Sequence, residues 1–179
     1  MSPRPLDLPF DPIERAGELW SERFGPAAAM RVATSIMRAQ QLLLARFDAA
    51  LKPYGLTFAR YEALVLLHFS RAGALPLSVI GARLMVHPTS VTNTIDRLVA
   101  QELVERQPNP RDGRGVLAAI TPAGRDVVAR ATDDLMLDGF GLAAYDETQL
   151  AELFGLLRVL RVDAGDFDSG GRDTDSRTS

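Results

Sequence analysis

The sequence predicts a mainly helical fold that carries one small β-hairpin. Seven segments place apolar residues at helical spacing, and most of them begin at a residue typical of a helix cap. One stretch changes to a strand-like pattern, in which two short apolar runs flank the pair Asp112-Gly113, a typical hairpin turn. The chain has 179 residues, of which 46% are hydrophobic, and this is enough for one compact domain.

The N-terminal half is expected to contain three helices. Residues 11–25 begin with Asp11 as N-cap, a proline at the first helical position and Glu14 at the third, so they predict a short helix. A longer helical pattern fills residues 27–52, and a further helix is expected over about 58–70. Residues 1–10 are expected to be a flexible N-terminus ahead of a single domain that spans 11–164.

Residues 76–121 predict two short helices followed by a hairpin. Ser78 is the expected cap of the first, which runs to about Met85, and Pro88 stands at the first position of the second. The expected strands are 103–106 and 116–120. Two short helices followed by a two-stranded wing form the winged helix-turn-helix, in which the second short helix enters the major groove of DNA.

Two further helices are expected after the hairpin. Thr121 and a following proline open the first, and Asp146 with Gln149 forms a capping-box-like start for the second. Residues 165–179 are rich in Gly, Asp, Ser, Thr and Arg, and this composition predicts a disordered tail.

The charge distribution allows a nucleic-acid partner although the whole chain is acidic. The net charge is −3, but residues 76–125 carry six Arg against four acidic residues. Cysteine is absent, which excludes disulfides and thiolate metal sites and fits a cytoplasmic protein. No apolar run approaches the roughly 18 to 20 residues of a membrane-spanning helix, so we expect no membrane partner.

The second short helix and the hairpin tip carry the residue types that contact DNA. With Val91, Ile95 and Leu98 turned inward, the outward face of the helix presents hydroxyl, amide and guanidinium groups, and the hairpin tip is basic. The candidate DNA contacts are Ser78, Thr89, Ser90, Thr92, Asn93, Arg97, Arg111, Asp112 and Arg114, with Arg114 at the minor groove and Asp112 as organiser of the wing. An ordinary solvated helix and a solvated charged turn are the alternatives.

These segments resemble the MarR family of bacterial winged-helix regulators. The resemblance is carried by Ile95-Asp96-Arg97-Leu98, by Asn109-Pro110-Arg111-Asp112-Gly113-Arg114 and by Ile120-Thr121-Pro122-Ala123-Gly124-Arg125, and it covers about 27–162. It implies a homodimeric repressor whose subunits interlock through helices in 27–52 and 122–162. It also implies a pseudo-palindromic operator with half-sites about one helical turn apart.

The added helix with Trp20 resembles the urate-responsive branch of that family. The matching ligand positions are Trp20, Glu62 and Arg106, with His68 as a possible neighbour, whereas Thr94 departs from the branch, which has an arginine there. Residues 54–62 and 84–93 are more similar to regulators of trans-aconitate methyltransferase genes, which implies a citrate- or aconitate-like organic anion. The alternatives are that Trp20 anchors the added helix in the core and that Glu62 and Arg106 form a structural ion pair.

An enzyme is not expected. His68 and His87 are the two histidines, and their spacing indicates no metal site. No catalytic nucleophile with its base and acid stands out, so we expect no catalytic residues and no cofactor. The two rival functions are a winged-helix module that binds protein instead of specific DNA, and a small enzyme that uses the pocket around Trp20.

Overall fold

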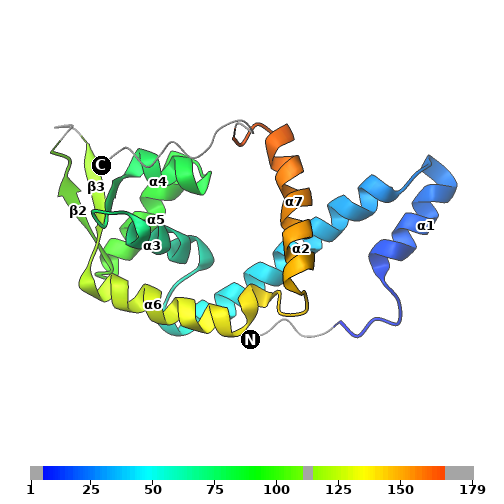
Figure 1. Cartoon of the computed structure of the whole chain (residues 1–179), viewed down its shortest axis with the longest axis horizontal. Helices are drawn as coiled ribbons and strands as arrows, with labels where there is room; N and C mark the ends of the chain where they lie inside the picture. Colours follow the sequence, from blue (N-terminus) through cyan, green and yellow to red (C-terminus); the bar gives the residue numbers. More distant parts are fainter. Residues whose placement is uncertain (1–5, 111–114, 168–179) are drawn as a thin grey trace. The chain divides into compact units, whose positions relative to one another are not determined.

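The computed structural model describes residues 6–110 and 115–167. Within these residues the chain forms seven α-helices, two short 3-10 helices and three β-strands (Figure 1). The mainly helical class with a small β-wing is therefore confirmed. The chain divides into two compact units, one up to Phe58 and one from Ala59 onward.

The first unit is a helical hairpin. It consists of α1 (Pro12–Phe24) and α2 (Ala28–Leu51), followed by the 3-10 helix η1 (Lys52–Tyr54) (Figure 1). Asp11 caps α1 as predicted, because its carboxylate accepts a hydrogen bond of 2.8 Å from the backbone N–H of Ile13. The chain leaves η1 through Gly55, whose φ of 66° is a left-handed conformation that favours glycine.

The second unit contains the two predicted short helices. α3 (Phe58–Phe69) begins at the boundary between the units, and α4 (Leu77–Leu84) and α5 (Pro88–Ala100) follow it. Each of these three helices contributes fully buried side chains to the core of this unit. They include Leu64, Leu67, Ile80, Ile95 and Leu98.

A three-stranded antiparallel sheet lies beside these helices. β2 (Val104–Pro108) and β3 (Val116–Ile120) form the predicted hairpin, and β1 (Ala74–Pro76) pairs with the other edge of β3 (Figure 1). The sequence predicted the hairpin but missed β1. Three residues that end in proline show no strand periodicity, and their pairing with β3 is a long-range contact.

The last two helices are α6 (Pro122–Leu137) and α7 (Glu147–Asp163), separated by the 3-10 helix η2 (Gly139–Gly141). Thr121 caps α6, and the predicted capping box of α7 is present: Asp146 accepts from the backbone N–H of Gln149 at 2.8 Å while the Gln149 side chain accepts from Asp146. Among the described residues, no residue of α7 is fully buried, although Leu150, Leu153 and Leu157 are half-buried.

One predicted cap is wrong. Pro76, not Ser78, is the N-cap of α4, and it makes no side-chain hydrogen bond. The reason is that β1 ends at Pro76 and the chain turns directly into the helix, which places Ser78 inside its first turn with an exposed side chain. Ser78 therefore keeps its hydroxyl available as a DNA contact.

Candidate nucleic-acid interface

α5 is held to the second unit by one apolar face. Val91, Ile95 and Leu98 are at most 2% exposed, and they recur at the three- and four-residue spacing of a helix face. Pro88 occupies the first helical position, and the imidazole Nδ1 of His87 accepts a hydrogen bond of 3.3 Å from the backbone N–H of Thr89. His87 is therefore a helix cap, a role that its position before a proline could have indicated.

The turn between α4 and α5 fixes the second helix against the first. Met85 adopts a left-handed conformation with φ 54°, and the backbone N–H of Val86 donates to the carbonyl of Gly81 at 3.0 Å. A β-carbon added at Gly81 would lie 3.1 Å from Cγ2 of Val91, so the absence of a side chain lets the two helices approach closely. This tight connection is the one that a helix-turn-helix requires.

The opposite face of α5 is exposed and polar. We call it the recognition face; its residues are Thr89, Ser90, Thr92, Asn93 and Arg97, all of them exposed. Thr92 donates its hydroxyl to the carbonyl of Pro88 at 3.2 Å. The side chains of Ser90, Asn93 and Arg97 have no hydrogen bond or ion pair in the part of the chain that the structure describes, so their donors and acceptors are available to an outside partner.

An ion pair connects α5 to the hairpin. The guanidinium of Arg106 on β2 donates to the carboxylate of Asp96 on α5 at 2.7 Å, and the two side chains are 34% and 56% exposed. The predicted alternative that Arg106 pairs with Glu62 is therefore wrong. The sequence could not show this, because the contact joins a helix to a strand and has no fixed spacing along the chain.

The tip of the wing lies outside the described residues. The predicted contacts Arg111, Asp112 and Arg114 belong to it, so their positions remain predictions. The described strands reach it from both sides: the ladder runs to the pair Pro108 and Val116, and the backbone N–H of Asn109 donates to the carbonyl of Gly115 at 3.0 Å.

A small pocket of about 60 Å³ lies between α3, α4 and α5. Glu62 of α3 lies at this pocket, and Ser90 and Thr94 line it from α5; its other lining residues are Ala59, Ile80, Leu84, Val86 and Val91. Partial burial beside these apolar groups raises the pKa of the Glu62 carboxyl. The carboxyl has no hydrogen bond or ion pair within residues 6–110 and 115–167.

The predicted ligand residues are not gathered at this pocket. Neither Arg106 nor His68 lines it, and His68 is an exposed residue near the end of α3 whose ring is tilted against Phe69 at 6.0 Å. Trp20 belongs to the first unit and is 41% exposed, so it is not fully buried in the described chain. Its ring instead lies 5.0 Å from that of Phe24 on the same helix.

The described segments contain neither a membrane-spanning helix nor a cluster of metal ligands. None of their helices combines the length and the hydropathy that crossing a membrane requires. Nor do these segments bring three or more His, Cys, Asp or Glu side chains together as a set of metal ligands.

The comparisons with known proteins agree on one family. Residues 54–115 match the MarR family. The chain is 64% identical to Sco5413, a MarR family transcriptional regulator from Streptomyces coelicolor, over 79% of this chain and 98% of that one, with a TM-score of 0.73. It is 30% identical to YhbI, an uncharacterised helix-turn-helix transcriptional regulator of Bacillus subtilis, over 59% of this chain and 68% of that protein. A mutant of MarR from E. coli, solved in complex with operator DNA, is 25% identical over 79% of this chain and 97% of its own, with a TM-score of 0.64.

Proposed function

The chain belongs to the MarR family of winged-helix transcriptional regulators, whose members bind DNA and are not enzymes, and from that premise we propose that it is a homodimeric repressor of a pseudo-palindromic operator. In this proposal α5 enters the major groove and the wing reaches the adjacent minor groove. The recognition face supplies the base and phosphate contacts from the major groove, and Arg114 supplies those in the minor groove.

The observation that carries this proposal is the two-sided construction of α5. One face is buried and fixes the helix, while the other presents polar groups that have no partners in the described chain. A helix that only needed to be solvated has no reason to collect Thr, Ser and Asn, which lower helix propensity. Asn and Arg are the side chains that pair bidentately with adenine and guanine.

The homodimer is supported by apolar surface on α7. Leu156 and Val159 are 72% and 67% exposed, and Leu160, which follows Leu156 at the four-residue spacing of one helix face, is exposed as well. Monomeric proteins seldom leave a contiguous apolar patch of this kind in water. The family resemblance implies that a second copy of the chain covers this surface. The resulting dimer brings two recognition helices to one duplex.

Fluorescence anisotropy tests the DNA proposal. The DNA upstream of the protein's own gene is titrated at several salt concentrations with wild type, Arg97→Ala and, as the control, Arg23→Ala, which removes one exposed arginine from α1. We expect specific binding that weakens with salt, and a slope reduced by about one for Arg97→Ala alone. Binding that does not depend on salt contradicts the proposal and favours the protein-interaction module.

We further propose that a small organic anion of the citrate or aconitate class controls operator binding. The support is the similarity of Trp20, Glu62 and Arg106 to ligand positions of a branch of the family. Two observations limit where the anion can bind: Arg106 is already paired with Asp96, and Glu62 repels an anion whenever it is ionised. The anion therefore needs a different cation.

A further inference from the structure

Arg31, near the start of α2, lies against the backbone of α1. A β-carbon added at Gly17 would overlap the Nε of Arg31 and would lie 2.8 Å from its Cζ and 2.9 Å from its Cδ. Gly17 is the buried residue of α1. The missing side chain at this position is what lets the guanidinium pack directly on α1.

The guanidinium of Arg31 is unpaired. Its Nε is buried and has no hydrogen-bond partner, and among the described residues no acidic side chain forms an ion pair with it. A buried donor without a partner is costly, and the cost is larger for a charged group. Such a group in a native protein calls for a partner that supplies the missing acceptor.

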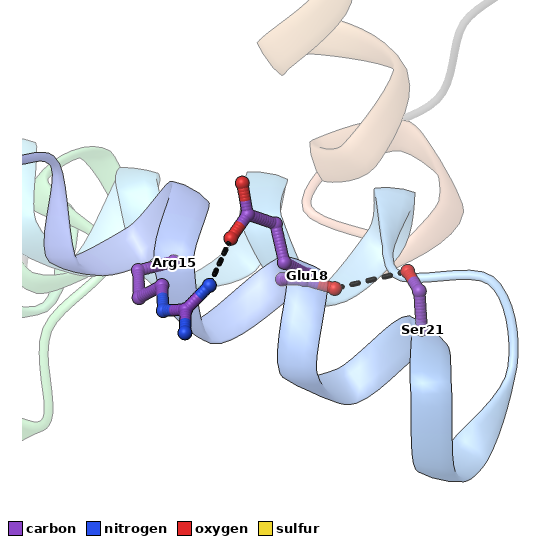
Figure 2. Close-up of polar contacts among 4 residues, drawn as sticks. Arg15, Glu18 and Ser21 are labelled. Atoms are coloured by element: carbon purple, nitrogen blue, oxygen red, sulfur yellow. Dashed lines mark hydrogen bonds and ion pairs between the residues drawn. The ribbon is translucent and has the colours of Figure 1, made fainter.

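Two polar side chains of α1 near Gly17 already have partners. The guanidinium of Arg15 donates to the carboxylate of Glu18, with 2.7 Å between Nη1 and Oε2 (Figure 2). The hydroxyl of Ser21 donates to the carbonyl of Gly17 at 2.9 Å (Figure 2). α1 thus packs against Arg31 without supplying an acceptor to it.

An aromatic pair follows on the same face of α1. Trp20 and Phe24 are three and seven residues after Gly17, a spacing that places all three on one side of a helix. Their rings lie 5.0 Å apart, and they are 41% and 72% exposed. Beside the guanidinium, α1 therefore offers an accessible apolar surface for the carbon skeleton of a ligand.

We propose that Arg31 is the anion-binding residue of this regulator and that it holds a carboxylate of a small organic acid against α1 at Gly17. The planar guanidinium presents its donors in a fork that matches a carboxylate, and such charge-assisted bonds are the stronger kind. This inference rests on the effector part of the proposed function and replaces Arg106 by Arg31 as the cation of the site.

Citrate titrations test the site without DNA. Trp20 is the one tryptophan of the chain, so its fluorescence reports binding on α1, and calorimetry gives the affinity independently. The variants are Arg31→Gln and Gly17→Ala, the second of which keeps the charge but displaces the guanidinium. Arg38→Gln is the matched control on α2, because Arg38 is exposed and donates to Gln41 at 3.1 Å.

We expect wild type to bind citrate, Arg31→Gln to lose about tenfold or more in affinity, and Arg38→Gln to change it by less than about twofold. Gly17→Ala should also weaken citrate, although alanine favours the helix over glycine. Wild type that binds no citrate, or Arg31→Gln that binds it normally, overturns the proposal. Inorganic phosphate that binds as tightly as citrate overturns the carboxylate assignment.

Two control measurements separate this inference from its premise. Operator affinity without citrate is measured for wild type, and an absence of operator binding by wild type counts against the proposed function and not against Arg31. Sedimentation tests the subunit interface. If Arg31→Gln weakens dimerisation and leaves citrate affinity unchanged, a carboxylate of the second subunit is the missing acceptor and the proposal is wrong.

Discussion

α5 and α7 are helices of similar length that are built in opposite ways. α5 buries Val91, Ile95 and Leu98 and exposes polar groups, whereas α7 has no fully buried residue among the described residues and exposes Leu156, Val159 and Leu160 on one face. What a helix leaves exposed indicates the chemistry of its outside partner. The exposed face of α5 suits phosphates and base edges, and that of α7 suits another apolar surface.

Truncating the buried side of α5 should give the largest effect on stability. Leu98→Ala removes a fully buried side chain, so we expect the free energy of unfolding to fall by about 2–5 kcal/mol. Urea denaturation followed by circular dichroism measures it. Leu156→Ala is the matched control on α7, and its cost should depend on protein concentration because it acts through association. If both variants lost the same free energy of unfolding at every protein concentration, the proposed difference between α5 and α7 would be wrong.

Charging the exposed side of α7 should break the dimer. Leu156→Glu combined with Val159→Glu places two carboxylates in the apolar surface, so we expect the dimer dissociation constant to rise by about 100-fold or more. Sedimentation velocity measures it. Thr148→Glu, which adds a negative charge in the first turn of α7, should leave the dimer intact. A double variant that stays dimeric at low concentration would remove α7 from the interface.

Removing polar groups from α5 should change DNA binding and leave the fold intact. We expect Asn93→Ala to lose about 1–3 kcal/mol of operator binding and to relax the preference for one base pair. Anisotropy with single-base operator variants measures both quantities. Arg114→Ala, at the predicted wing tip, should weaken binding by about 1–3 kcal/mol, with a smaller salt slope. Wild-type affinity and base preference in both variants would contradict the proposed docking.

The ion pair between α5 and β2 should have a smaller effect. It is partly exposed, so a double-mutant cycle with Asp96→Asn and Arg106→Gln should give a coupling of about 0.2–1 kcal/mol in unfolding free energy. Each single substitution should reduce the free energy of operator binding by more than it reduces the free energy of unfolding. The reason is that the ion pair fixes the position of α5 relative to the wing. The variant with the two charges exchanged, Asp96→Arg with Arg106→Asp, should regain part of the stability that the single substitutions lose. A coupling of zero in both measurements would mean that the contact has no energetic role.

Substitution of Glu62 should have the smallest effect on the free energy of unfolding. The sign of that effect follows from the raised pKa of the Glu62 carboxyl. The folded state binds the proton of Glu62 more tightly than the unfolded state, so its contribution to stability decreases as the pH rises above the ordinary glutamate pKa of about 4.3. Glu62→Gln should therefore be slightly more stable than wild type at pH 7, and the difference should shrink toward pH 4. Thermal denaturation across that range measures it; a difference that grows on acidification would contradict this reasoning.

The sequence predicted the features that depend on neighbouring residues. The caps at Asp11 and Asp146 and the proline that starts α5 are local chemistry, and each lies where it was expected. The buried side of α5 followed from helical spacing. For α7 the same spacing selects Leu150, Leu153, Leu157 and Leu160, of which the first three are half-buried. It does not select Leu156 and Val159, which are more exposed.

What the sequence could not predict depends on contacts between distant residues. β1 exists because β3 offers an edge to pair with, and the propensities of Ala74-Leu75-Pro76 give no sign of it. The pairing of Arg106 with Asp96 and the packing of Arg31 on Gly17 each join two separate elements. The resemblance that groups Trp20, Glu62 and Arg106 as ligand positions could not show that Arg106 pairs with Asp96.

The central position of β3 in the sheet also determines how easily this strand can open locally. β3 is bonded on one side to β1, which leads into α4, and on the other to β2, and the ladder continues from Ile120 to Gly73 at 2.8 Å between N and O. It cannot detach without breaking both ladders at once. Its amide protons should thus exchange with solvent late and together with those of β1 and β2, so that the three strands open as one cooperative unit.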